Sequence, residues 1–115
     1  MDIATIKPRL KSLLEYHRGR NNAILRREIR RILEIELKDD RQLRLLIGEL
    51  RRDGVPVLFS TKKPAGYYVA TNLKELQEGM EAMRSYIIDE CRTLRDLRIY
   101  GQRYLAKEEQ GVLVI

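Results

Sequence analysis

The sequence has very few of the residues that build disulfide frameworks, metal centres and most catalytic sites. Its 115 residues include one cysteine, Cys91, and one histidine, His17. A single cysteine cannot form an internal disulfide, and one cysteine with one histidine is too few for a structural zinc site. The seven glycines are scattered singly, so no glycine-rich phosphate loop is present. We therefore expect no metal, no cofactor, no small-molecule substrate and no catalytic residues: the chain is not predicted to be an enzyme.

The two scarce side chains have simple structural interpretations. His17 falls on the apolar side of an expected first helix, where a partly buried and hydrogen-bonded histidine is the expected state. Cys91 lies in a long helical segment and has no second histidine to activate it as a nucleophile. We interpret Cys91 as a small hydrophobic residue.

Long apolar segments are also absent. No apolar run approaches the roughly 20 residues needed to span a bilayer. The N-terminal segment "MDIATIKPRL" lacks the basic-then-apolar pattern of a secretory signal. We expect no membrane partner and a cytoplasmic location. The length suits one domain with an appendage.

Positive charge is concentrated in the first part of the chain. Residues 1–71 contain 16 Lys and Arg against 9 Asp and Glu, whereas residues 72–115 contain 7 against 8. Basic residues gathered on one module are typical of a protein that binds a polyanion. The alternative is a solvated, arginine-rich surface, and the charge alone does not separate the two.

Apolar residues at helical spacing predict three short helices, over residues 7–18, 25–33 and 39–53. Each helix presents one apolar stripe that would face a shared core. The expected core positions are Ile6, Leu10, Leu13 and Leu14 in the first helix, Leu25, Ile29, Ile32 and Leu33 in the second, and Leu43, Leu46, Ile47 and Leu50 in the third.

The boundaries of these helices are marked by specific residues. Pro8 lies near the expected first turn of the first helix, and "GRNN" at 19–22 separates the first two helices. A short turn, or a small strand at 35–37, precedes the third helix. Asp39 or Asp40 is expected to cap that helix.

A two-stranded hairpin is predicted directly after the third helix. Gly54 suits the C-terminal end of the helix, and Pro56 prevents its continuation. Two β-prone runs follow, Val55–Ser60 and Tyr67–Thr71. Alternating apolar residues would pack the hairpin on the helices, because an isolated hairpin is barely stable in water. The packing residues are expected to be Val55, Val57, Phe59, Tyr67 and Val69, and the tip holds Lys62, Lys63, Pro64 and Gly66.

Three short helices followed by a hairpin define the winged-helix form of the helix-turn-helix. The predicted fold class is therefore α+β, mostly α, with a two-stranded wing and a long C-terminal helix. Residues 1–71 would form the DNA-binding domain and residues 72–115 a dimerisation helix and tail. In this fold the lysines at the wing tip can reach a phosphate backbone beside the groove that the third helix enters.

The sequence also resembles the small winged-helix proteins of bacteriophages and prophages. The resemblance runs from Gly19 to Tyr86, through "GRNNAI", "LRREI", "DDRQLRLLIGELRRDGVPVLFS" and "GYYVATNLKELQEGMEAMRSY". In that pattern Arg41–Pro56 corresponds to the recognition helix and the turn into the wing, and "GYYVAT" to the return strand. The resemblance implies a DNA-binding fold. One departure is Leu25, which stands where the pattern has a helix-capping Ser or Thr.

The third helix carries the expected base contacts. With its apolar stripe in the core, Arg41, Gln42 and Arg44 are best placed to enter a major groove, where Arg pairs with guanine and Gln with adenine. Gly48 removes side-chain bulk one turn further on, either for close approach of DNA or for tight helix packing. In the alternative interpretation the arginines are surface residues paired with neighbouring carboxylates, namely Asp40, Glu49 and Asp53.

Phosphate contacts are expected from the second helix and the wing. The second helix has four arginines opposite its apolar stripe, at least two of which we expect to be solvated or paired with Glu28 and Glu34. The wing lysines have no core role, although exposed lysine also serves solubility. The candidate phosphate-binding residues are Arg26, Arg27, Arg30, Arg51, Lys62 and Lys63.

The remaining segment predicts one long helix that needs a partner. Asn72 and Glu75 have the spacing of a capping box, and apolar residues then recur every seven positions as far as Tyr104. A helix from Leu73 to Tyr104 would be about 48 Å long, whereas a domain of 70 residues has a radius of gyration of about 11 Å. Much of the stripe would stay uncovered, so we expect a homodimer; the alternative is that the helix breaks near Gly101 or folds back across its own domain. The expected dimerisation residues are Met80, Met83, Ile87, Leu94 and Leu97.

Two functions from different classes remain open on the sequence. The first is a non-enzymatic protein that binds double-stranded DNA, in transcription regulation, replication or packaging. The second is a winged-helix adaptor that binds another protein within a phage replication or packaging assembly, with the basic residues serving solubility. The terminal "GVLVI" is apolar and has no assigned role.

Overall fold

The computed structural model describes residues 3–34 and 40–110. The chain divides into two compact units, Met1–Ala82 and Met83–Ile115. The division falls within a helix, later than the expected boundary between residues 71 and 72, because the first turns of that helix belong to the first unit. The elements, in order, are α1 (Ile3–Tyr16), the 3₁₀ turn η1 (Arg20–Asn22), α2 (Arg26–Leu33), α3 (Asp40–Arg52), β1 (Val57–Ser60), β2 (Gly66–Val69), α4 (Leu73–Asp96), the π-helical turn η2 (Leu97–Gly101) and α5 (Gln102–Glu109).

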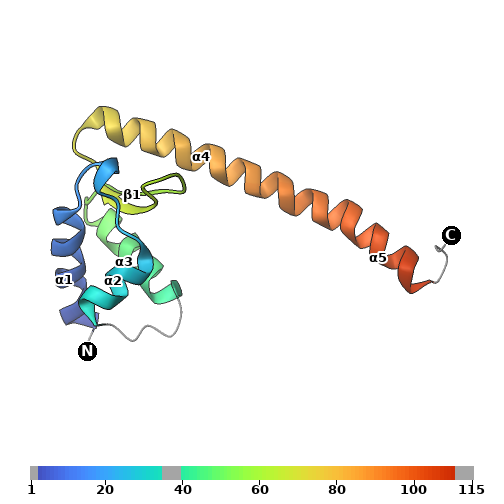
Figure 1. Cartoon of the computed structure of the whole chain (residues 1–115), viewed down its shortest axis with the longest axis horizontal. Helices are drawn as coiled ribbons and strands as arrows, with labels where there is room; N and C mark the ends of the chain where they lie inside the picture. The colour runs from blue at the N-terminus through green and yellow to red at the C-terminus, as the bar shows by residue number, and fades with distance from the viewer. Residues whose placement is uncertain (1–2, 35–39, 111–115) are drawn as a thin grey trace. The chain divides into compact units, whose positions relative to one another are not determined.

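Helices α1, α2 and α3 form one hydrophobic core with the hairpin (Figure 1). The expected stripe of α3 is confirmed, since its four apolar residues are all buried. Leu10 and Leu14 of α1 are fully buried, and Leu13 packs against the cluster from its edge. The mostly helical α+β class expected from the sequence is therefore present, with a two-stranded antiparallel sheet and a long helix after it.

Two details of the helices differ from the expectation. Helix α1 begins at Ile3 rather than residue 7, so Pro8 lies inside it. Helix α2 begins at Arg26, and Leu25 precedes it in an extended conformation with no side-chain cap. Leu25 and Ile32 are exposed, so α2 buries only Ile29 and Leu33 of its expected stripe. Leu25 precedes the helix, and the core covers only the part of the α2 surface that holds Ile29 and Leu33. The small strand expected at 35–37 and a cap at Asp39 lie outside the described residues.

The hairpin pairs β1 with β2 in the register Val57↔Val69 to Ser60↔Gly66. Its strands are shorter than expected, because β1 begins at Val57 and β2 ends at Val69. The segment between α1 and α2 lies along the other edge of β2: Ile24 and Tyr67 exchange two backbone hydrogen bonds of 2.8 Å. Gly66 makes this pairing sterically possible. It has a φ of 127°, and a Cβ there would lie 2.2 Å from the carbonyl oxygen of Ile24.

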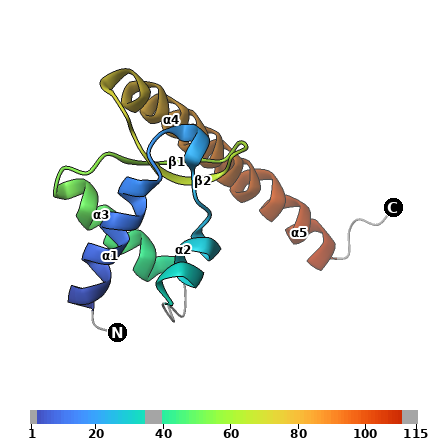
Figure 2. The same ribbon diagram turned by 60° about the vertical axis from the view of Figure 1, so that its left-hand side comes forward.

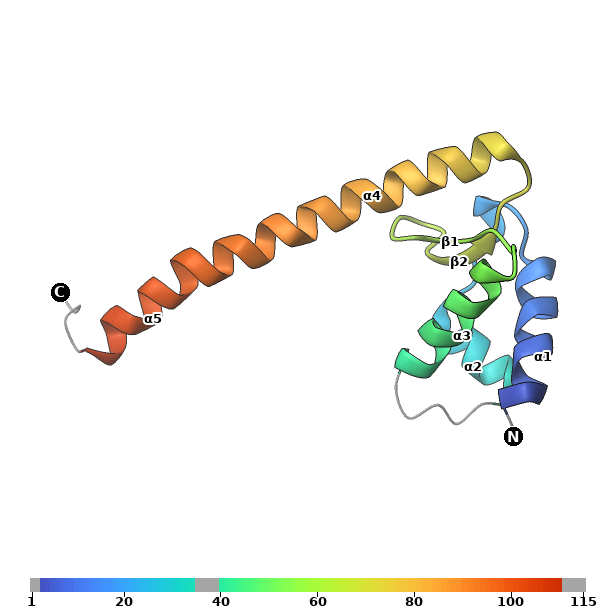
Figure 3. The ribbon, with the colours of Figure 1, turned by 180° about the vertical axis from the view of Figure 1, so that it is seen from behind.

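Both faces of the hairpin are covered, which the sequence reasoning did not anticipate. Val57, Tyr67 and Val69 face the three-helix core as expected. Leu58 and Tyr68 are buried as well. They lie on the opposite face, under the first turns of α4, which belong to the same compact unit (Figure 3). Gly79 of α4 is the contact point, since a Cβ there would lie 2.5 Å from Leu58 Cδ1 and 2.9 Å from the Tyr68 hydroxyl.

From α4 to α5 the chain is helical throughout, so the break considered near Gly101 does not occur (Figure 2). The π-helical turn η2 occupies Leu97–Gly101 instead. A π turn holds about one residue more than an α turn. A strict heptad spacing therefore does not continue through η2. No helix in the described ranges is long and apolar enough to cross a membrane.

Candidate nucleic-acid interface

Helix α3 has one continuous exposed face along its length. Arg41, Arg44, Leu45, Gly48 and Arg52 follow the spacing i, i+3, i+4, i+7, i+11, which places them on one side of the helix. All except the half-buried Gly48 are exposed. This face carries three arginines, and Glu49 borders it, four positions after Leu45 and three before Arg52. Gln42 is also exposed, one position round from Arg41.

Two carboxylates at the C-terminal end of α3, Glu49 and the following Asp53, pair with α1. Lys7 Nζ is 2.9 Å from Asp53 Oδ2 and 3.6 Å from Glu49 Oε2. The hydrogen bond from Lys7 and its charge hold the pKa of Asp53 below its ordinary value, with a smaller contribution from Arg52. In the alternative interpretation Asp40, Glu49 and Asp53 pair with the arginines of α3; two of these carboxylates, Glu49 and Asp53, pair with Lys7. No hydrogen bond or ion pair joins Arg44 to another described residue.

Arg51 has a structural contact that the sequence reasoning missed. Its Nε donates a hydrogen bond of 2.8 Å to the carbonyl oxygen of Val57, at the start of β1. Partial burial lowers the pKa of the guanidinium, which still stays charged near neutral pH. Arg51 thus ties the end of α3 to the hairpin. It is oriented toward β1, away from the first turns of α3 where the expected base contacts lie.

The arginines of α2 fall into two groups. Arg31 pairs with Glu28 through hydrogen bonds of 2.6 Å and 3.2 Å, which hold the pKa of Glu28 below its ordinary value. This confirms the expected pairing of an α2 arginine with Glu28. Arg26 and Arg27 are exposed and Arg30 is half-buried. These three, expected to contact phosphate, thus lie at or near the surface of the module that contains α3.

The hairpin tip presents Lys62 and Lys63 to solvent. Ser60 organises the tip, because its hydroxyl accepts a hydrogen bond from Lys62 N and donates one of 2.9 Å to Lys62 O. Both lysines are exposed, and neither ammonium group forms an ion pair within residues 3–34 and 40–110. Two unneutralised cations therefore occupy a short, turn-stabilised loop.

A polar network at the opposite end of the unit positions the start of α4. Asn72 Oδ1 accepts a hydrogen bond of 2.8 Å from Glu75 N, which confirms half of the expected capping box. The Glu75 carboxylate does not return to Asn72. It accepts from Thr71 N at 2.9 Å and from Arg20 N at 3.3 Å. The start of α4 is thereby tied to η1, and the spacing of Thr71 and Glu75 was the available sequence signal.

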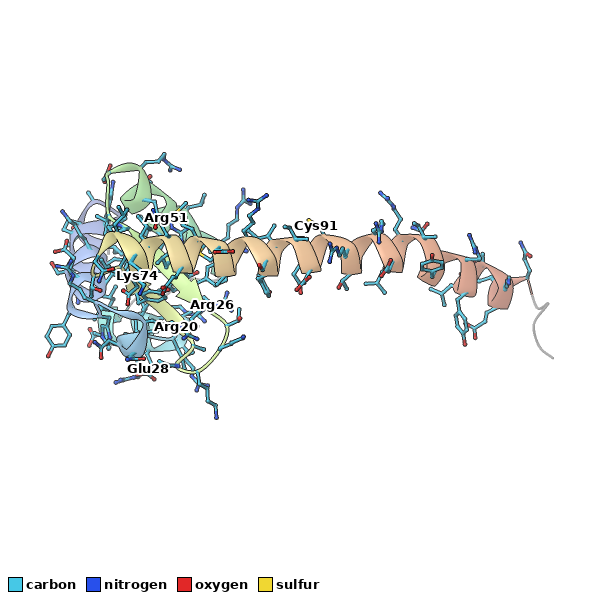
Figure 4. The ribbon with its side chains drawn as sticks, turned by 90° about the horizontal axis from the view of Figure 1, so that it is seen from above. Arg20, Arg26, Glu28, Arg51, Lys74 and Cys91 are labelled. Atoms are coloured by element: carbon cyan, nitrogen blue, oxygen red, sulfur yellow. The ribbon has the colours of Figure 1, made fainter. Side chains whose placement is uncertain are left out.

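His17 and Cys91, the one histidine and the one cysteine of the sequence, lie in different surroundings. His17 is half-buried, and its Nδ1 lies 2.7 Å from the carbonyl oxygen of Asn22, which requires Nδ1 to donate. The expectation of a partly buried, hydrogen-bonded histidine is confirmed. Cys91 is exposed on α4 (Figure 4), so it adds nothing to the core formed by the described residues. That part of the chain also holds no cluster of three metal-binding side chains.

Comparisons with protein-family models, with curated proteins and with solved structures return no match for this chain.

Proposed function

We propose that this chain is a non-enzymatic winged-helix protein of the phage or prophage type, which binds double-stranded DNA as a homodimer in the cytoplasm. The observation that carries the proposal is the exposed face of α3. Arg41, Arg44 and Arg52 are exposed on it, and two nearby carboxylates, Glu49 and Asp53, pair with Lys7 of α1. An exposed helix face that carries arginines is suited to the negative potential of a DNA groove.

The order of the elements supports the same proposal. A helix, a segment paired with the sheet edge, two further helices and a hairpin follow one another in the first unit. This is the order expected of a winged helix, with α3 as the recognition helix. The wing is rigidly supported, since its two faces pack against the helical core and against the first turns of α4.

Each cationic group then has its own role. Arg41 and Arg44 contact guanine edges in the major groove, and Gln42 contacts adenine. Arg26, Arg27 and Arg30, with Lys62 and Lys63, bind the phosphate backbone and fix the position of α3 in the groove. Arg51 serves mainly to hold the hairpin against α3, and its free Nη groups are available for a phosphate.

Dimerisation is proposed from the apolar stripe of α4. Met80, Ile87 and Leu94 recur every seven residues and are 56%, 53% and 66% exposed. Leu97 on the second line of the stripe is exposed too, and Met83 is half-buried. Repeated large apolar side chains at heptad spacing favour pairing with a second helix. Two winged units joined in this way would bind two half-sites related by a dyad.

The salt dependence of DNA binding tests the central proposal. If about five phosphates are contacted per protomer, log Kobs should fall against log salt with a slope of about −4 to −5. The variant with Lys62→Ala and Lys63→Ala should weaken binding to all sequences alike and reduce the slope by about 2. A slope shallower than about −2 for the unmodified protein would overturn the proposal and favour the adaptor function.

A further inference from the structure

Leu45 is the one large apolar side chain of α3 that does not enter the core. Leu43, Leu46, Ile47 and Leu50 are each no more than 5% exposed, whereas Leu45 is 57% exposed. Single exposed leucines are common on protein surfaces and need no explanation by themselves. The position of Leu45 is what distinguishes it, because it lies midway along the cationic face of α3.

The neighbours of Leu45 on that face have complementary properties. Arg41 lies one turn before it, Arg44 is adjacent in sequence, and Gly48 lies one turn after it. Gly48 has no side chain, and the nearest group to its missing Cβ is the guanidinium of Arg52 at 3.6 Å. The leucine side chain therefore stands beside a low part of the helix surface, between cations. A ligand for this surface must be anionic and must also offer a small apolar group.

We infer that Leu45 contacts the C5-methyl group of a thymine in the major groove. This inference rests on the proposed DNA-binding function. The thymine methyl is the apolar group that a base pair presents in the major groove, and aliphatic side chains contact it directly. One helical turn advances about 5.4 Å and one base step about 3.4 Å. The thymine would thus lie within about two base pairs of the base contacted by Arg41.

Replacement of thymine by deoxyuridine provides the test, because it removes one methyl group and leaves base pairing unchanged. The preferred duplex is first selected from random sequences with the full-length protein, and each thymine is then replaced singly. At one position per half-site the substitution should weaken binding roughly fourfold, the effect of removing one buried methyl group. Leu45→Ala should bind the thymine and deoxyuridine duplexes equally well at that position.

Ile32→Ala is the matched control, since Ile32 is 43% exposed on α2 but lies outside the α3 face. It should retain the full thymine preference. Equal sensitivity of the unmodified protein and Leu45→Ala at every thymine would overturn the inference, while a steep salt dependence would leave the proposed function intact. Failure of the unmodified protein to bind any duplex would overturn both, and loss of a protein partner by Leu45→Ala would assign this surface to an adaptor function.

Discussion

Two amphipathic helices in this chain, α3 and α4, have different relations to their surroundings. Helix α3 buries its whole apolar stripe in the first compact unit and exposes a face with arginines. Helix α4 has an equally regular stripe, but only Gly79 is buried along its 24 residues. Among residues 83–110 no side chain is buried. The same sequence pattern is therefore buried in an internal core in one helix and exposed in the other.

The two helices differ because other parts of the chain cover the apolar stripe of α3 but not most of that of α4. Helix α3 is packed against α1 and the hairpin, so its apolar side chains are removed from water by other parts of the unit. Helix α4 meets the hairpin through Gly79, where the missing side chain permits close approach to Leu58 and Tyr68. Beyond Ala82 the helix belongs to the second unit, whose described residues provide no such cover.

The largest expected effect is a loss of stability in the first compact unit. Gly66→Ala places a Cβ 2.2 Å from a backbone oxygen of Ile24 at a φ of 127°, so both the pairing and the conformation are lost. Unfolding free energy, measured by urea denaturation, should fall by about 4 kcal/mol or more, beyond the range of most single substitutions.

Gly54→Ala is the matched control, because Gly54 also has a positive φ, of 100°, but nothing lies within 4 Å of the added Cβ. It should cost only about 1–2 kcal/mol, the strain of the left-handed backbone. Equal losses for the two variants would show that the contact with Ile24 is unimportant.

The next largest effect concerns the proposed dimerisation through the apolar stripe of α4. Replacing Ile87 and Leu94 with Lys places charge in the proposed seam, which is costly unless the helices separate. The double variant should sediment as a monomer with an unchanged urea midpoint for the first unit. Its affinity for a two-site duplex should fall about 100-fold, toward that for a half-site, because the linkage of two sites is lost.

Arg92→Glu and Arg95→Glu, both on exposed positions of α4, provide a control that changes charge without altering the stripe. This control should remain dimeric. A monomeric unmodified protein at tens of micromolar would contradict the dimer and leave the stripe to another partner.

Features that depend on contacts close in the sequence were predicted well, and features that depend on contacts between distant segments were not. The stripe of α3, the hairpin and the heptads of α4 follow from local periodicity, and each was predicted at nearly its observed position. Burial of Leu58 and Tyr68 was not, because it requires α4 to lie over the far face of the hairpin. Exposure of Ile32 was likewise missed, since apolar residues at helical spacing do not specify how much of the helix surface the rest of the fold covers.

The candidate site was predictable in its residue types but not in its pairings. The sequence placed Arg41, Gln42 and Arg44 outside the core, and all three are exposed. The contact of Lys7 with Asp53 joins residues far apart in the sequence, and that of Arg51 with Val57 joins the end of α3 to β1, so neither follows from the periodicity of one helix. Only the folded arrangement separates cations used for structure from those open to a ligand.

Gly48→Ala should separate stability from binding on α3. The added Cβ would meet Arg52 at an ordinary contact distance of 3.6 Å, so helix propensity should raise the unfolding free energy by up to about 1 kcal/mol. DNA affinity should nevertheless fall several-fold, because the low part of the proposed groove-facing surface is filled. Gly101→Ala, in η2, is the control and should not change half-site affinity. Unchanged affinity for Gly48→Ala would show that α3 does not approach DNA closely there.

The smallest effect concerns the ion pairs of Lys7 with Glu49 and Asp53. The hydrogen bond with Lys7 lowers the pKa of Asp53 from 3.8 and raises that of Lys7 from 10.5. The Asp53 contribution to stability is therefore present above pH 3.8 and is lost as the pH falls through the lower folded value. The Lys7 contribution is present below pH 10.5 and is lost as the pH rises through the higher folded value.

Lys7→Gln should accordingly lower Tm slightly at neutral pH. The difference in Tm from the unmodified protein should vanish at both extremes of pH and shrink in high salt. Lys74→Gln, which removes a looser pair of 4.0 Å on α4, should have no comparable effect. A Tm difference for Lys7→Gln that stayed constant from acid to alkaline pH would show that packing of the Lys7 chain, not its charge, connects α1 to α3.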